Sequence, residues 1–223
     1  GSLVSKKRLK AEIEKIKIKD IETNWSTKYE NNWGLEVAKI EENVLCTPYG
    51  SIPAFDKDYL TKFFTALDWR GFNSNQHFEE MYSNLTNDLL DNIEIPEGER
   101  ILPALKTAAD EMRHYLLLKF YRQYLNDTGV IFKDAMASLQ YTSFHFLVAD
   151  GPTKFITSDS TAFIHKREDE KLIGLLPITP RLLMMKGKCT EDDGLYYVTH
   201  ITDEAVNGYN NAIRTNAEEF IIC

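Results

Sequence analysis

The 223-residue sequence predicts an α+β protein: an N-terminal helical half of about five helices, then a small mixed, mostly antiparallel sheet and a C-terminal helix. Apolar residues recur every three or four positions through most of residues 27–148, as on one face of a helix. After Asp150-Gly151-Pro152 the pattern changes to short runs of β-branched and aromatic residues separated by turn residues. Residues 202–217 return to helical spacing, with Thr202 as N-cap and an acidic first turn.

Five helices are expected before the change of pattern. The first two end at turn residues, Pro48 and Gly71, and the third begins at a Ser74 N-cap. Pro103 is placed in the first turn of the fourth, where a missing N–H is tolerated. The fifth becomes almost wholly apolar near its end and should be buried on all sides. The expected ranges are 27–46, 55–70, 74–89, 102–124 and 130–148.

The second half should contain the strands. Pro177 and Pro180 interrupt one apolar stretch, which predicts a strand, a bend and a second strand. The last three apolar residues of the chain are expected to return to the sheet. The expected strand ranges are 154–157, 162–164, 171–173, 175–185, 195–199 and 220–222.

These patterns predict three parts of one compact domain: a charged helix or arm over 1–24, a helical subdomain over 25–150 and a β-rich subdomain over 151–223. The first part carries seven Lys and Arg against four acids. Such a segment is either a solvated amphipathic helix or a basic arm for nucleic acid or a partner.

The composition predicts a globular protein. The chain has 26 Lys+Arg and 34 Asp+Glu, for a net charge of -8, and it is 43% hydrophobic. An acidic balance argues against nucleic-acid binding through bulk charge. No apolar run reaches the ~18 residues that a membrane span needs.

Cysteine usage and the first residues bear on location and completeness. Three widely spaced cysteines, Cys46, Cys189 and Cys223, are typical of a reducing compartment and indicate the cytoplasm. The start Gly1-Ser2 resembles a cloning scar, so we expect a fragment of a longer protein.

The common catalytic motifs are not present. None of the five histidines lies three to five residues from another histidine or a cysteine, so no local metal site is expected. The glycines form neither of the two nucleotide-binding loops, and no Gly-x-Ser-x-Gly elbow occurs.

One set of carboxylates allows a hydrolytic alternative. Asp159 ends an expected strand, and Asp169 and Lys171 begin the next. Restriction-type nucleases use an acid on one strand and Asp-x-Lys on its neighbour to hold Mg²⁺ or Mn²⁺ and to activate water. The other interpretation of residues 166–171 is a solvated, charged hairpin tip.

Arg70 lies at an expected helix end, just before Gly71. A cation there either caps the helix carbonyls or forms an anion-binding site near the junction of the two halves.

Three segments together resemble a known family. They are Phe155-Ile156-Thr157-Ser158-Asp159, Leu176-Pro177-Ile178-Thr179-Pro180 and Val206-Asn207-Gly208-Tyr209-Asn210, with Glu36, Glu41 and Arg70 in the helical part. The chain resembles a widespread bacterial family of uncharacterised proteins, a domain of unknown function, over about residues 30–222. The chain lacks the family's N-terminal His-His-x-Val-Pro segment, and it has Ser160-Thr161 where the family favours Asn-Pro. The resemblance implies a fold but no reaction.

The functional prediction is therefore a bacterial, cytoplasmic domain that binds a ligand or a protein partner. Its alternative is a metal-dependent nuclease or a toxin or defence component, and whether the protein is an enzyme is left open. Short polar residues at a strand end either build a turn or line a pocket where the two halves meet. The candidate binding residues are Arg70, Thr157, Ser158, Asp159, Asn207 and Asn210.

Overall fold

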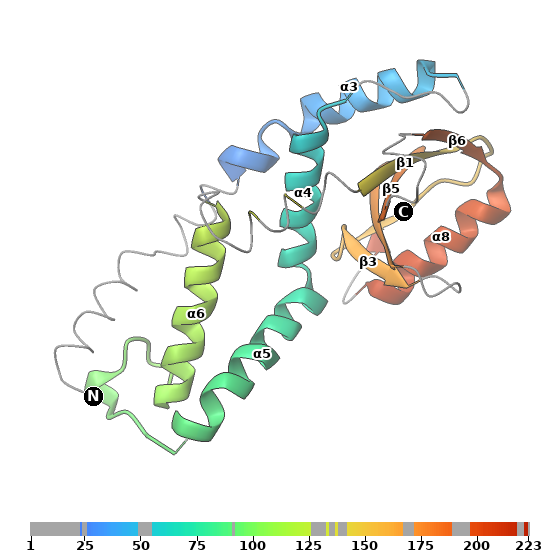
Figure 1. Ribbon diagram of the computed structural model, residues 1–223. Helices are drawn as coiled ribbons and strands as arrows, with labels where there is room; N and C mark the ends of the chain where they lie inside the picture. The colour runs from blue at the N-terminus through green and yellow to red at the C-terminus, as the bar shows by residue number, and fades with distance from the viewer. Residues whose placement is uncertain are drawn as a thin grey trace. The chain divides into compact units, whose positions relative to one another are not determined.

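The structure, a computed structural model, describes residues 26–48, 55–90, 92–125, 142–166, 172–188, 197–217 and 221–222, together with residues 23, 133 and 137. The predicted α+β class is confirmed, because helices dominate the first part and precede a mixed sheet and a closing helix (Figure 1). The chain forms two compact units, one of Gly1–Lys28 and Asn75–Asp134, the other of Tyr29–Ser74 and Ala135–Cys223. The predicted three-part division stays a prediction.

The main sheet belongs to the second unit and has the strand order β3-β4-β5-β1-β6. Its neighbouring strands are antiparallel except β1 and β6, which run parallel. β1 is an interior strand in this order, since β5 and β6 pair with its two edges. The strands are β1 (Thr142–Ala149), β3 (Phe163–Lys166), β4 (Leu172–Thr179), β5 (Leu182–Lys188) and β6 (Tyr197–Ile201).

β1 corrects the prediction of a helix over 130–148, because residues 142–149 form a strand. Most of 130–141 lies outside the described residues. Phe146 is fully buried, as predicted, and so are Val148 and Ala149. A strand covered on both faces is apolar at consecutive positions, and periodicity cannot distinguish such a run from a buried helix.

Helices α3 (Trp33–Cys46) and α4 (Lys57–Arg70) lie on one side of this sheet. Asp56 begins α4 by accepting the Tyr59 N–H at 2.9 Å. A Cβ added to Gly174 of β4 would lie 2.5 Å from Phe64 Cζ, so the glycine makes room for this α4 ring. Trp33 of α3 stacks on Phe63 of α4, with ring centroids 4.0 Å apart.

The opposite face of the sheet packs against α8 (Asp203–Asn216), where Thr202 is the N-cap as predicted. Val206 and Ile213 of this helix share a buried cluster with Leu147 of β1 and Leu183 of β5. Leu147 and Phe146 are consecutive in β1 and point to opposite faces: Leu147 packs in the cluster with α8, and Phe146 contacts Phe55, just before α4. The sheet thus has two apolar faces, each covered by helices.

A second, two-stranded sheet is formed by β2 (Thr157–Ser158) and β7 (Ile221–Ile222), paired antiparallel. The prediction that residues 220–222 return as a strand is confirmed for 221–222. The partner of β7 is the predicted Thr157-Ser158 motif, so the end of the described chain lies beside it.

The first unit contains most of α5 (Phe72–Leu90), a 3-10 turn η2 (Glu97–Glu99) and α6 (Ala108–Leu125). Phe78 of α5 and Phe120 of α6 pack with ring centroids 4.5 Å apart. A π-helical turn, η1 (Ser26–Glu30), precedes α3. Within the described residues, no helix combines the length and apolarity needed to cross a bilayer.

Two predicted helix starts are wrong. α5 begins at Phe72 rather than at Ser74, because the Gly71 N–H already closes α4 on the carbonyls of Leu67 and Asp68. α6 begins at Ala108 rather than Leu102. Thr107 caps it: its hydroxyl accepts the Asp110 N–H at 3.1 Å, and the Asp110 carboxylate accepts the Thr107 N–H at 3.0 Å.

Candidate functional site

Thr157 and Ser158, two of the predicted binding residues, line a pocket of about 310 Å³ in the second unit. We call it the Trp33 pocket. Its walls are Trp33 of α3, the segment 155–158 with Thr161, the segment 177–180 at the end of β4, and Ile222 of β7. Most of this lining is apolar, and none of the described residues that form it carries a charged side chain.

Four hydroxyl groups line the Trp33 pocket, and three of them are engaged. Ser158 Oγ donates to the Ser160 carbonyl at 3.2 Å, and Thr161 Oγ1 donates to the Ser158 carbonyl at 2.9 Å. Thr179 Oγ1 donates to Glu41 Oε1 at 3.0 Å and accepts the Arg181 N–H at 3.2 Å. These bonds fix the two loops that form the wall of the pocket.

The fourth hydroxyl, Thr157 Oγ1, is buried and has no hydrogen-bond partner among the described residues. Burying a hydroxyl without a partner costs about 1–3 kcal/mol in proteins, so such groups are rare and need an explanation. Thr157 also lines the pocket, so its hydroxyl lies next to the pocket wall, but the oxygen itself has almost no accessible surface and a ligand would reach it only after a local shift of that wall.

Asp159 follows this strand and builds the turn after it. Its Oδ1 accepts the Ser160 N–H at 3.0 Å, which is a charge-assisted hydrogen bond to the backbone. This contact agrees with the turn-building alternative for Thr157-Ser158-Asp159. Asp159 does not line the Trp33 pocket.

The motif around Asn210 has a visible structural role. Asn210 is 3% exposed, and its amide donates to the Lys154 carbonyl at 2.8 Å and accepts the Ile156 N–H at 3.1 Å. α8 therefore holds the extended backbone that leads into the pocket wall. Asn207 is exposed. Ligand binding by either asparagine stays a prediction.

Arg70 is the last residue of α4, and its side chain lies outside what the structure describes. The end of the helix is closed by the backbone N–H of Gly71. Both alternatives for Arg70, the cap and the anion site, stay predictions.

The hydrolytic alternative needs Asp159, Asp169 and Lys171 on one metal ion. Residues 167–171 lie outside the described residues, so their convergence is untested. In the sequence, β3 separates Asp159 from the segment 167–171. That segment connects Lys166, at the end of β3, to Leu172, at the start of β4, and these two residues are paired in the sheet. In the part of the chain that the structure describes, no group of three His, Cys, Asp or Glu is placed to hold a metal ion.

A second polar feature, which sequence reasoning missed, lies where α4 meets the sheet. Lys186 Nζ on β5 lies 5.0 Å from the centroid of the Phe64 ring. Burial lowers the pKa of Lys186 to about 8, although nearby Asp68 opposes this shift. Burial likewise raises the pKa of Asp68 to about 6, against the attraction of Lys186. The sequence signal for this feature was a lysine that follows the apolar residues of β5.

The histidines show no shared site. Burial lowers the pKa of His145 on β1, which agrees with the prediction of a core histidine. His200 Nδ1 lies 2.6 Å from Asp150 Oδ1, and both side chains are well exposed. Sequence reasoning also missed Trp33 and Thr161 as pocket residues, because each is an ordinary helix or loop residue until the chain folds.

Comparison with known proteins gives one finding. A family model described as protein of unknown function (DUF4238) matches residues 7–223. Searches of curated proteins and of solved structures found no match to the chain. The match covers nearly the whole length and agrees with the resemblance carried by the motifs. The chain belongs to this family, the proteins of unknown function DUF4238.

Proposed function

We propose that the second unit binds a small uncharged molecule in the Trp33 pocket. An apolar ring of the ligand packs against Trp33, Pro177 and Pro180, and an acceptor group receives the Thr157 hydroxyl proton. The buried, unpartnered Thr157 Oγ1 is the observation that carries this proposal. The volume of about 310 Å³ suits a compound of one or two rings.

The lining supports both parts of this ligand description. The described part of the lining carries no charged side chain, so a charged ligand would lose its hydration there without gaining an ion pair. The protons of the other three hydroxyls are already donated to Ser160, Ser158 and Glu41. Thr157 is thus the lining hydroxyl that can donate, and the ligand must offer a carbonyl, ether or hydroxyl oxygen.

The test is ligand-observed NMR with benzamide as the uncharged probe, and benzoate and benzylamine as charged counterparts of similar size. We expect benzamide to bind best. Thr157→Val keeps the shape of the side chain and removes the hydroxyl, and it should weaken benzamide about tenfold, the loss expected for one hydrogen bond. Thr157→Ser should retain most of the affinity.

The matched control is Thr215→Val, a change at an exposed threonine of α8 whose hydroxyl bonds the Asn211 carbonyl. It should leave benzamide binding unchanged. Equal binding of all three probes, or equal loss in Thr157→Val and Thr215→Val, would contradict the proposal. We also infer a cytoplasmic location in bacteria, which the sparse cysteines support.

The nuclease, as a toxin or defence component, stays the rival prediction. It requires wild-type cleavage of nucleic acid with Mg²⁺ or Mn²⁺ and its loss in Asp159→Asn, with folding unchanged. The bond from the Ser160 N–H to Asp159 supports the turn role instead. Asparagine keeps that acceptor oxygen, so the variant separates the two roles: unchanged stability with no cleavage by the wild type favours the turn.

A further inference from the structure

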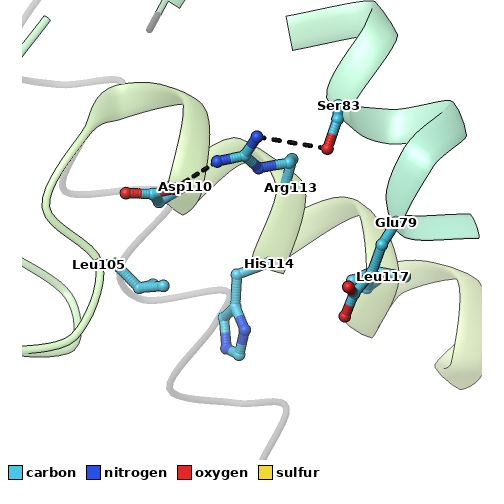
Figure 2. Close-up of a pocket in the computed structure, with 7 residues that line it drawn as sticks. All are labelled: Glu79, Ser83, Leu105, Asp110, Arg113, His114 and Leu117. Atoms are coloured by element: carbon cyan, nitrogen blue, oxygen red, sulfur yellow. Dashed lines mark hydrogen bonds and ion pairs between the residues drawn. The ribbon is translucent and has the colours of Figure 1, made fainter. Parts of the chain in front are cut away.

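The first unit contains a pocket of about 320 Å³ between α5 and α6, distinct in its chemistry from the Trp33 pocket. We call it the α5–α6 pocket. Glu79 and Ser83 of α5 lie on one side, and Asp110, Arg113 and His114 of α6 lie on the other (Figure 2). Two leucines, Leu105 and Leu117, complete the lining and supply apolar surface.

Asp110 and Arg113 neutralise each other within this pocket. Arg113 forms an ion pair with Asp110 and also donates from Nη1 to Ser83 Oγ at 3.3 Å. Burial alone would raise the pKa of Asp110, but hydrogen bonds from Thr107 and Arg113 outweigh it and lower that pKa. The pair is therefore ionised, fixed at the start of α6, and nearly neutral in sum.

Glu79 and His114 are the remaining polar groups, and among the described residues neither has a hydrogen-bond or ion-pair partner. In Figure 2 both side chains extend toward the lower side of the pocket, whereas the Arg113 guanidinium lies at its upper side, between Asp110 and Ser83. Burial lowers the pKa of His114, so its ring is neutral near pH 7 and one ring nitrogen can accept a hydrogen bond. Counting only the described residues, the pocket thus offers one carboxylate without a cationic partner, on the exposed Glu79, and one neutral acceptor on His114.

We propose that the α5–α6 pocket binds a small organic cation, an alkylammonium or alkylguanidinium, through the Glu79 carboxylate and the His114 imidazole. The cationic nitrogen donates to both groups, and the alkyl stem lies against Leu105 and Leu117. Nitrogen cations fit this arrangement because they bring several donors to two acceptors. A divalent metal does not fit, because it needs more oxygen or nitrogen ligands than the described residues place together.

The experiment titrates the whole protein with n-butylammonium and n-butylguanidinium by NMR, with pentan-1-ol and valerate as uncharged and anionic probes of similar length. We expect both cations to bind at least tenfold more tightly than either other probe. Glu79→Gln removes the charge without changing the shape, and it should weaken cation binding about tenfold. His114→Phe keeps a ring but removes the acceptor, and it should weaken binding several-fold.

Glu80→Gln is the matched control, because Glu80 is the next residue of α5, is exposed and does not line the pocket. It should leave the affinity unchanged. Three outcomes would overturn the proposal: no saturable cation binding by the wild type, equal binding of pentan-1-ol, or equal weakening by Glu80→Gln and Glu79→Gln. The pocket, probes and variants differ from those for the Trp33 pocket, so either proposal can fail alone.

Discussion

Lys186 and Asp68 are two opposite charges that are mostly buried near the ring of Phe64. Among the described residues these two side chains form no salt bridge, and each acts on the other through its electric field. Burial disfavours both charged forms more than this attraction favours them. The pair therefore lowers the stability of the folded protein near pH 7.

The first prediction is that Asp68→Asn stabilises the protein at about pH 7. The pKa of Asp68 rises from 3.8 to about 6 on folding, so the folded state holds its proton more tightly than the unfolded state. Its contribution to stability is full below about pH 4 and is lost as the pH rises through 6. Asparagine cannot ionise, so we expect a gain of about 1–2 kcal/mol at about pH 7, after allowance for the residual attraction to Lys186.

Urea unfolding at about pH 7 and about pH 4 measures this gain. The control is Asp58→Asn, an exposed residue in the first turn of the same helix, which should lose a few tenths of a kcal/mol. A variant at Asp68 that is less stable than wild type at about pH 7 would mean that Lys186 needs this partner.

The elements of the second unit depend on close fit between α4 and the sheet. Gly174 lies on β4 opposite Lys186 of β5, and the Phe64 ring occupies the space that a side chain at Gly174 would take. The ring cannot move outward without leaving its place in the core, where it is 1% exposed. The packing of helix on sheet thus specifies a glycine within a strand.

The second prediction concerns this contact. Gly174→Ala places a Cβ 2.5 Å from Phe64 Cζ, so the ring or the strand must shift, and we expect a loss of about 1–3 kcal/mol. Gly187→Ala, on the neighbouring strand, meets its nearest atom at 3.9 Å and should cost far less. Thermal unfolding of both variants is the measurement. Similar losses would show that strand flexibility, rather than the ring, decides the effect.

The elements also show what could be read from the sequence. α8 was predicted correctly because Thr202, an acidic first turn and a clear apolar stripe agree. The prediction of a helix at β1 was wrong because a strand buried on both faces shows no alternating pattern. The strands that pair with it also lie tens of residues later in the chain. The Thr157 motif was recognised, but Trp33 reaches the same pocket only through tertiary packing, which no local pattern encodes.

At the scale of the whole molecule, each unit contains a histidine whose protonation lowers the stability of the folded state. Burial lowers the pKa of His114 in the first unit and of His145 in the second below their ordinary 6.5. The unfolded chain then binds more protons than the folded one as the pH falls through 6.5. Asp68 acts in the opposite direction below about pH 6, because its folded state binds the extra proton.

The third prediction follows from these opposing signs. The free energy of unfolding of the wild type should fall as the pH is lowered from about 7.5 to about 6, and then fall less steeply as Asp68 gains its proton. The free energy of unfolding of Asp68→Asn should continue to fall steeply below about pH 6. Denaturant unfolding across this range measures both curves, and parallel curves would contradict the assignment of the flattening to Asp68.

The interior position of β1 in the sheet has a consequence for how the protein is made. A ribosome releases β1 before β5 and β6, and the strand cannot complete both edges until the chain has grown to Ile201. Until then an apolar strand with open hydrogen-bonding edges is displayed to the cell, a template for association with other nascent chains. α4 cannot pack on the sheet until later either. The segment Asn75–Asp134, which belongs to the other unit, is synthesised after α4 and before the strands that α4 covers. The sheet is thus completed only after synthesis has passed Ile201, and the interval before it is the period in which a chaperone has most to protect.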